Sequence, residues 1–223
     1  EKAGISPKFV KRGSAASGHA VIQVDEEGRN SIVISAGANR ELDSDQIQDA
    51  VLRLEGNDWL LLQNETNGIA EAIELAAQEE KKVAINIAPA DERMFDYPLS
   101  KVALLIVNEL EAMALSSQPS PKLAFDWLIN AYTEIDIVLT LGEEGVWFYQ
   151  AKDSVRKGMG SFNIVAADET AAGDSFIGYL MAMLVAGKDL HGSITLASAA
   201  GALAATRPGA VDSIPALDSV KTL

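Results

Sequence analysis

The 223-residue sequence is long enough for one large domain or two small ones, and it carries a formal net charge of −14. Hydrophobic residues make up 48% of the chain and charged residues 22%, so a sizeable core can form and wholesale disorder is not expected. The excess of 32 acidic over 18 basic residues argues against nucleic acid as a partner. The absence of cysteine excludes disulfides and a cysteine nucleophile, and it favours a cytoplasmic location.

The first predicted elements are two short strands. Residues 20–24 and 31–35 are rich in β-branched side chains, and the stretch between them, 25–30, contains the turn-forming Gly28. Hydrophobic and polar residues alternate in these strands, so one face of the pair should be less buried than the other. We therefore expect a β-hairpin over 18–37 that projects from the main sheet as a lid, and whose strands are available for pairing in a homodimer.

From residue 43 onwards, predicted helices and strands alternate. Asp43 or Ser44 can cap a helix whose apolar residues Ile47, Val51 and Leu54 share one face, and Gly56 ends it. The later elements are a strand at 59–62, a helix at 67–79, strands at 83–87 and 102–107, a short helix after 108, a helix over 123–131, strands at 135–141, 146–150 and 155–165, and closing helices at 176–187 and 192–206.

The predicted strands are continuous apolar runs separated by helices. Such strands are typical of a mostly parallel sheet with helices on both faces, so the sequence predicts an α/β fold. The closing helices are too short to cross a bilayer, so no membrane is expected as a partner. We expect Trp59, Trp127 and Trp147 in the core. No repeat or linker marks a second domain, so residues 1–223 are predicted to form a single domain.

The stretch from Asp168 to Phe176 carries the strongest chemical signal. Small residues at a helix start let the backbone approach a ligand, and the unpaired N–H groups there suit a phosphate. Asp174 would repel that anion, so its presence makes sense if its carboxylate accepts a proton from an attacking hydroxyl. The alternative is that Asp174 only favours the positive end of the helix dipole.

Two further stretches follow predicted strands. Thr140–Gly145 is a strand end with a two-glycine turn, the place where open α/β sheets bind ligands, although taken alone it is better explained as a plain hairpin turn that needs no ligand. Asn108–Glu111 offers an amide and carboxylates that could face hydrated Mg²⁺, with helix capping as the alternative.

Together and in this order, the three stretches resemble the PfkB carbohydrate kinase family. Asn108–Glu111 stands for the family's Asn-x-x-Glu motif, Thr140–Gly145 for its nucleotide turn, and Asp168–Asp174 for its C-terminal signature, with Ala171 where many members have glycine. The likeness covers nearly the whole chain, and further similar stretches lie at 35–39, 62–65, 85–90, 206–210 and 213–215.

The resemblance implies the family's ribokinase-like three-layer sandwich, and it implies phosphoryl transfer from ATP to a sugar hydroxyl, with D-ribose giving D-ribose 5-phosphate as the favoured reaction. By resemblance Asp174 is the general base at the sugar, and the N–H groups of Ala172, Gly173 and Asp174 form the anion hole. The nucleotide and its Mg²⁺ would be bordered by Asn108, Glu111, Thr140, Leu141, Gly142, Glu143, Glu144, Gly145, Gly173, Asp174 and Ser198.

The resemblance also implies a sugar contact and a second cation. Glu65 is the one residue that matches the family's sugar-contacting set. A monovalent cation, K⁺, would lie behind the anion hole and order it. Its predicted oxygen ligands belong to Asp168, Thr170, Ala204, Arg207, Gly209 and Ser213.

The family's opening strand and glycine-rich sugar loop have no counterpart in this sequence. We therefore expect a domain that lacks its N-terminal portion, and a 223-residue polypeptide that by itself binds ATP weakly, phosphorylates ribose negligibly and is poorly soluble. The alternatives are an inactive nucleotide-binding fragment, or a PfkB kinase for another sugar or a nucleoside. An unrelated dinucleotide-binding domain is disfavoured, because no Gly-x-Gly-x-x-Gly follows an early strand.

Overall fold

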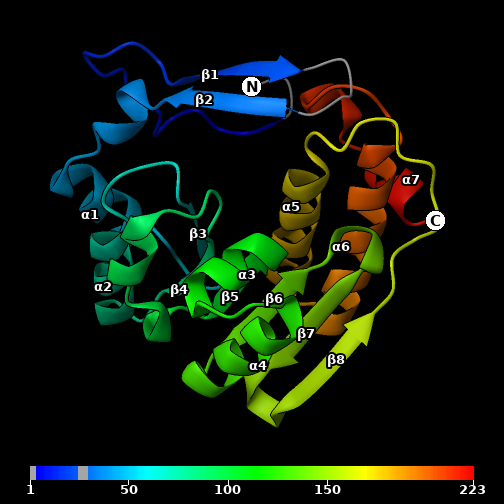
Figure 1. Cartoon of the computed structure of the whole chain (residues 1–223). Helices are drawn as coiled ribbons and strands as arrows, with labels where there is room; N and C mark the ends of the chain where they lie inside the picture. The colour runs from blue at the N-terminus through cyan, green and yellow to red at the C-terminus, as the bar shows by residue number, and fades with distance from the viewer. Residues whose placement is uncertain (1–3, 25–29) are drawn as a thin grey trace.

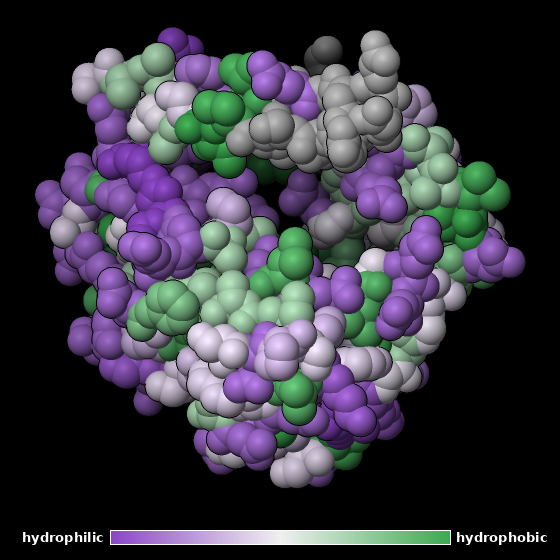
Figure 2. All heavy atoms as spheres, in the orientation of Figure 1, coloured by the Kyte–Doolittle hydropathy of each residue, from purple (hydrophilic) through white to green (hydrophobic). Residues whose placement is uncertain are grey.

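The computed structural model describes residues 4–24 and 30–223, which form a six-stranded mixed sheet between two helical layers and a separate two-stranded hairpin (Figure 1). The hairpin consists of β1 (His19–Val24) and β2 (Asn30–Ser35), which pair antiparallel with Val21 opposite Val33. The predicted turn residues 25–29 lie outside the described residues. The hairpin lies apart from the main sheet in Figure 1, and Figure 2 shows a hollow beneath it.

The main sheet follows chain order, β3-β4-β5-β6-β7-β8. Strands β3 to β6 are parallel and are joined through helices, whereas β7 and β8 are antiparallel additions at one edge. The strand bounds are β3 Trp59–Gln63, β4 Lys82–Asn86, β5 Leu104–Asn108, β6 Asp136–Thr140, β7 Val146–Gln150 and β8 Val155–Met159.

The helices begin largely where capping residues predict. Asp43 caps the first helix through a reciprocal pair of hydrogen bonds with Gln46, as the sequence indicates. The α-helices are α1 Ser44–Leu52, α2 Ile69–Gln78, α3 Glu109–Ser116, α4 Pro121–Ala131, α5 Ala172–Val185, α6 Leu190–Ala205 and α7 Leu217–Val220. Short 3-10 helices are η1 Gly37–Arg40, η2 Glu92–Asp96, η3 Leu99–Lys101, η4 Gly142–Glu144, η5 Ala151–Asp153 and η6 Val211–Ser213. In the described ranges no helix combines the length and the apolar character that a membrane span requires.

Strands β4 to β6 are buried on both faces of the sheet, which explains why they are continuous apolar runs, whereas the edge strand β8 is largely exposed. Ile85 and Leu105 belong to the core beneath α1–α4, whereas their neighbours Ala84 and Leu104 belong to the core beneath α5 and α6. Successive residues of a strand point to opposite faces, so each buried strand supplies both cores. The α/β fold with helices on both faces is thereby confirmed.

Three details differ from the sequence prediction. The last strand stops at Met159 instead of continuing to 165, because its partner β7 begins at Val146, the residue opposite Met159. Leu54 lies beyond α1, which ends at Leu52. Trp127 was expected in the core but is 37% exposed on α4, where its ring packs edge-on against another ring, that of Tyr132.

Candidate active site

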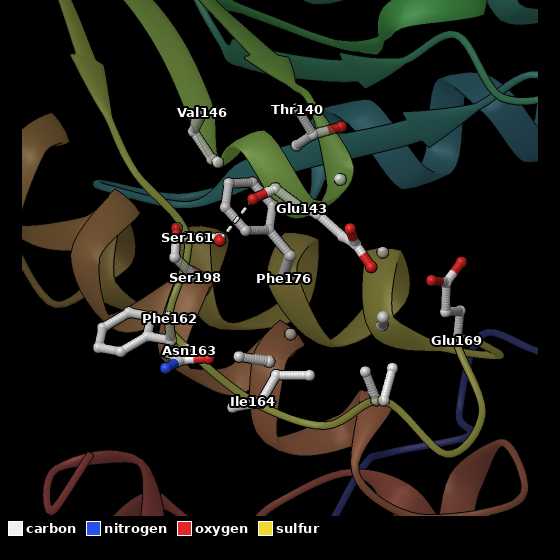
Figure 3. A pocket seen from close by; sticks show the side chains of 18 residues that line it. Thr140, Glu143, Val146, Ser161, Phe162, Asn163, Ile164, Glu169, Phe176 and Ser198 are labelled. Atoms are coloured by element: carbon white, nitrogen blue, oxygen red, sulfur yellow. Dashed lines mark hydrogen bonds between the residues drawn. The ribbon is translucent and has the colours of Figure 1, made fainter.

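A cavity of about 620 Å³ opens where the carboxyl end of β6 meets the start of α5 (Figure 3). Such a position, beyond the carboxyl ends of parallel strands, is where open α/β sheets bind ligands. The cavity brings together seven residues that the sequence predicts for the site: Thr140, Gly142, Glu143, Gly145, Ala172, Gly173 and Ser198. These residues come from stretches far apart in the sequence and meet at one place in the fold.

The turn after β6 is a rigid wall of this cavity. Leu141 N–H donates to the Gly145 carbonyl oxygen at 2.8 Å, and the Ser161 hydroxyl donates to the Glu143 carbonyl oxygen at 2.5 Å (Figure 3). Gly142 and Gly145 have φ of +53° and +100°, and a Cβ at Gly145 would lie 2.1 Å from a backbone oxygen. The turn itself therefore requires both glycines.

Not every residue of the predicted nucleotide turn reaches the cavity. Leu141 is buried in the core beneath α1–α4, and Glu144 is exposed outside the cavity lining. Both assignments to the nucleotide remain predictions, and any contact through Leu141 would have to come from its backbone.

The start of α5 forms the opposite wall. Ala171 precedes the helix with φ of +61°, a left-handed conformation that costs a residue with a side chain roughly 1–2 kcal/mol. Glycine adopts this conformation without that cost. The glycine that many members of the family have in place of Ala171 would therefore suit this backbone. Ala172 N–H already donates to the Glu169 carbonyl oxygen at 3.1 Å. Within the described residues the N–H groups of Gly173 and Asp174 have no such acceptor, and the anion hole formed by Ala172, Gly173 and Asp174 stays a prediction.

Gly173 has no structural reason to be glycine. It adopts no left-handed φ, and a Cβ added there would meet no atom within 4 Å. Glycine in a helix is about 1 kcal/mol less favourable than alanine. Because Gly173 lines the cavity, its open side faces the space that a ligand would fill.

Asp174 is exposed in the first turn of α5, directly after Gly173. It does not line the cavity itself. Its own N–H is one of the two donors without an acceptor among the described residues, so Asp174 adjoins the predicted anion hole. An acidic side chain in the first turn of a helix also interacts favourably with the helix dipole, and this alone can explain why Asp174 is there. The catalytic role of Asp174 therefore remains a prediction.

Asn108 and Glu111 form a reciprocal helix cap. Asn108 N–H and its side-chain amide donate to the two Glu111 carboxylate oxygens at 2.9 and 2.8 Å, and Glu111 N–H donates to the Asn108 side chain at 2.8 Å. Burial raises the pKa of Glu111, which is 4% exposed. Capping thus accounts for the geometry. Neither residue lines the cavity, although Asn108 lies opposite Thr140 in the sheet. Their role toward Mg²⁺ stays a prediction.

The two segments predicted to hold a monovalent cation meet at Asp168. Its carboxylate accepts hydrogen bonds from the N–H groups of Thr170 and Gly209, both at 2.9 Å. Hydrogen bonds from Thr170 and Gly209 lower the pKa of Asp168 to about 2, so this carboxylate is ionised near neutral pH. The other predicted ligands are the buried Ala204 and Ser213 and the exposed Arg207, which all belong to the same α6–η6 region.

Glu65 lies apart from the first cavity. It is exposed in the loop between β3 and α2 and borders a second cavity, of about 970 Å³. This cavity is also lined by residues 8–13, by the segment after η1 and by α1. The structure therefore separates the predicted sugar contact from the predicted nucleotide pocket.

The sequence analysis missed one wall of the first cavity. Ser161, Phe162, Asn163, Ile164 and Ala166 line it, but the first four fell inside the strand predicted over 155–165 and Ala166 directly follows that range. Their alternating polar and apolar residues imitate a strand. Gly160, directly before them, was the available signal that the strand ends.

Comparison with known proteins adds independent evidence. Residues 1–217 match the profile of the pfkB family carbohydrate kinases. The chain is 33% identical over 208 residues to the ribokinase of Haemophilus influenzae, a match that covers 89% of this chain and 66% of that protein. The chain thus spans slightly less than two thirds of the length of this relative.

Solved structures agree with the sequence match. Ribokinase from Thermotoga maritima superposes with a TM-score of 0.79 at 31% identity, covering 95% of this chain and 71% of that one. Ribokinase from Cryptococcus neoformans, solved in complex with ADP, superposes with a TM-score of 0.78 at 28% identity, covering 94% and 72%. The likeness therefore extends across the fold described above.

Proposed function

The chain belongs to the pfkB family of carbohydrate kinases, and on this premise we propose that the protein transfers the γ-phosphoryl group of ATP to a sugar hydroxyl, with D-ribose as the favoured substrate. Gly173 is the observation that carries the proposal. A helix glycine that neither the backbone nor its neighbours require, placed at the cavity wall, leaves room for a phosphoryl group. The Haemophilus influenzae and Thermotoga maritima relatives support ribose as the sugar.

In the proposed reaction the oxygen of the sugar hydroxyl forms a bond to the γ-phosphorus, and the bond from that phosphorus to the β-phosphate oxygen breaks to release ADP. Asp174 accepts the hydroxyl proton. The N–H groups of Gly173 and Asp174 stabilise the negative charge on the transferring oxygens, in line with the positive end of the α5 dipole. The turn at Thr140–Gly145 and Ser198 would border the nucleotide, because they line the same cavity.

We propose two cation sites, built from the oxygen atoms of the predicted ligands. Asn108 and Glu111 would hold hydrated Mg²⁺ through water, since both already face one another at a strand end. Bound Mg²⁺ would neutralise phosphate charge. Asp168 supplies a permanent carboxylate for a monovalent cation next to the Gly209 backbone. A cation there would fix the segment from Asp168 to Ala171 that leads into the anion hole.

The proposal is tested by measuring sugar-dependent ADP release with the protein expressed from its whole reading frame. With D-ribose present, ADP should be released at a rate of about 1 s⁻¹ or more. 2-Deoxy-D-ribose, D-fructose and a nucleoside serve as competing substrates, and phosphorus NMR identifies the product. Tight ATP binding with no acceleration by any of these acceptors would instead support the inactive nucleotide-binding alternative.

Potassium should activate the enzyme more than sodium does. The reason is the ionised Asp168, whose loop partner Gly209 turns with φ of +94° beside it. Initial rates are compared in potassium, sodium and tetramethylammonium chloride at one ionic strength. Asp168→Asn, which removes the charge, should abolish the difference between the salts. Equal rates for the unmodified enzyme in all three salts would contradict the site.

We also propose a homodimer through the hairpin and a cytoplasmic location. Val21 and Val33 lie opposite each other on one face of the hairpin, and they are 52% and 63% exposed. Covering such a face is favourable by the hydrophobic effect. The absence of cysteine supports a reducing compartment.

A further inference from the structure

One arginine donates hydrogen bonds to the residue before and the residue after Glu65 in its loop. Arg93, from the distant η2 segment, donates through Nη2 to the Asn64 carbonyl oxygen at 2.8 Å and through Nη1 to the Thr66 carbonyl oxygen at 2.9 Å. These are the carbonyls immediately before and after Glu65. A single planar guanidinium therefore holds the carbonyl groups of the residue before and the residue after Glu65.

Arg93 is itself held in one orientation. The Asp91 carboxylate accepts from Nε at 3.0 and 2.9 Å and from Nη2 at 2.5 Å. The ion pair is partly exposed, with the two side chains 33% and 40% accessible, and such pairs contribute little to stability. The arrangement therefore does more to set the direction of the guanidinium than to stabilise the fold.

The residue before Glu65 is anchored independently. Asn64 is fully buried, its amide donates to the Pro89 carbonyl oxygen at 2.6 Å, and it accepts from the Tyr97 hydroxyl at 2.5 Å. The strand end thus enters the loop along a fixed path.

The residues after Glu65 are tied to the segment that leaves the hairpin. The Thr66 hydroxyl donates to the Asn39 carbonyl oxygen at 2.7 Å, and Arg40 adds a second donor to the Thr66 carbonyl at 2.9 Å. The Asn67 side chain exchanges two hydrogen bonds with the Leu42 backbone. Backbone contacts therefore surround Glu65 on every side.

The Glu65 side chain differs from its neighbours. It is exposed, borders the second cavity, and has no hydrogen-bond partner among the described residues. All of the surrounding contacts thus fix its backbone while its carboxylate stays available.

We propose that Arg93 is a positioning residue for Glu65, which it aims at the sugar by holding the two flanking carbonyls. The inference rests on the proposed function, because it takes Glu65 as a sugar contact. Lysine keeps the charge of Arg93, but its single ammonium cannot reproduce a planar fork shared among Asp91, Asn64 and Thr66. The distinction between charge and geometry makes the proposal testable.

The test compares Arg93→Lys, Glu65→Gln and the double variant in steady-state kinetics of the protein from its whole reading frame. Arg93→Lys should raise the KM for ribose on the order of 10-fold, because a misplaced charged hydrogen bond costs about that factor. The KM for ATP should change less than about 2-fold, since Glu65 lies outside the nucleotide cavity. In the Glu65→Gln background, Arg93→Lys should add little further.

Arg156→Lys is the matched control, because Arg156 is exposed on β8, its guanidinium pairs with the Asp126 carboxylate, and it lines neither cavity. It should leave both KM values unchanged. A purely structural role predicts equal effects of Arg93→Lys with and without Glu65, or a parallel rise in the KM for ATP. Either result would overturn the proposal, as would an unchanged KM for ribose.

Hydrogen exchange separates this inference from the proposed function. Arg93→Lys should speed amide exchange at Asn64 and Leu42, whose N–H groups donate to the Ala88 carbonyl oxygen and to the Asn67 side chain, without any sugar present, whereas Arg156→Lys should not. Unchanged amide exchange would contradict the proposal that Arg93 holds the Glu65 loop, even if the kinase is active. Faster amide exchange in a protein that phosphorylates none of the sugars would support the contacts of Arg93 with the loop. The absence of phosphorylation would overturn both the proposed function and the role of Arg93 in directing Glu65 at a sugar.

Discussion

Replacing Asp174 with asparagine should lower the rate of phosphoryl transfer by about 10²-fold or more, which is the usual size of a general-base contribution. Asparagine keeps the size and most of the hydrogen-bonding capacity of the side chain but cannot accept the sugar proton. ATP affinity should change little, because the side chain does not line the cavity. Single-turnover kinetics with saturating ribose and ATP, together with calorimetric ATP titration, measure the two quantities.

Asp189→Asn is the matched control for this experiment. Asp189 also stands at a helix start, where its carboxylate accepts from Gly192 N–H at 2.7 Å, and asparagine caps a helix about as well. If Asp174 only favoured the helix dipole, its asparagine variant would behave like this control and lose at most about 1 kcal/mol of stability. Near-normal turnover of Asp174→Asn would remove Asp174 from the mechanism.

Gly173→Ala should change stability and activity in opposite directions. Alanine is about 1 kcal/mol more favourable in a helix, which corresponds to a rise in Tm of about 2–4 °C for a protein of this size. The added methyl meets no protein atom within 4 Å, so nothing in the fold offsets this gain. Because Gly173 lines the cavity, the methyl group should crowd a phosphoryl group held there, and displacing the reacting atoms by about 1 Å can lower kcat on the order of 10²-fold.

Gly178→Ala controls for helix propensity alone. Gly178 is an exposed glycine of the same helix, a Cβ there also meets nothing within 4 Å, and it lies outside the cavity lining. Its alanine variant should gain stability and keep full activity. Thermal unfolding and ADP release are measured on both variants. If Gly173→Ala proved as active as Gly178→Ala, the space at Gly173 would have no role in phosphoryl transfer.

The elements of the fold were predictable because their signals are local. Apolar runs such as 83–87 and 102–107 reported strands buried on both faces, and Asp43 marked a helix start through its own hydrogen bond. The strand predicted to reach residue 165 failed for a nonlocal reason. A strand ends when its partner turns away, and periodicity within the strand contains no information about that partner.

The residues of the candidate site also differ in whether local sequence signals could predict them. The residues of the turn and of the α5 start were found because small residues at strand ends and helix starts are informative by themselves. The capping pair of Asn108 and Glu111 shows the limit, since one spacing suits both a cap and a metal site. The grip of Arg93 on Asn64 and Thr66 could not be foreseen, because it joins segments far apart in sequence through backbone carbonyls that carry no residue-specific signal.

Among the residues that the structure describes, the walls of the first cavity all come from the chain between Thr140 and Ala205. A chain grows from its N-terminus and its domains fold as units during synthesis, so these walls emerge late. The parallel strands β3 to β5 precede all of these walls in the chain. Under the proposed function, ATP in this cavity would therefore stabilise only molecules in which α6 has already been made.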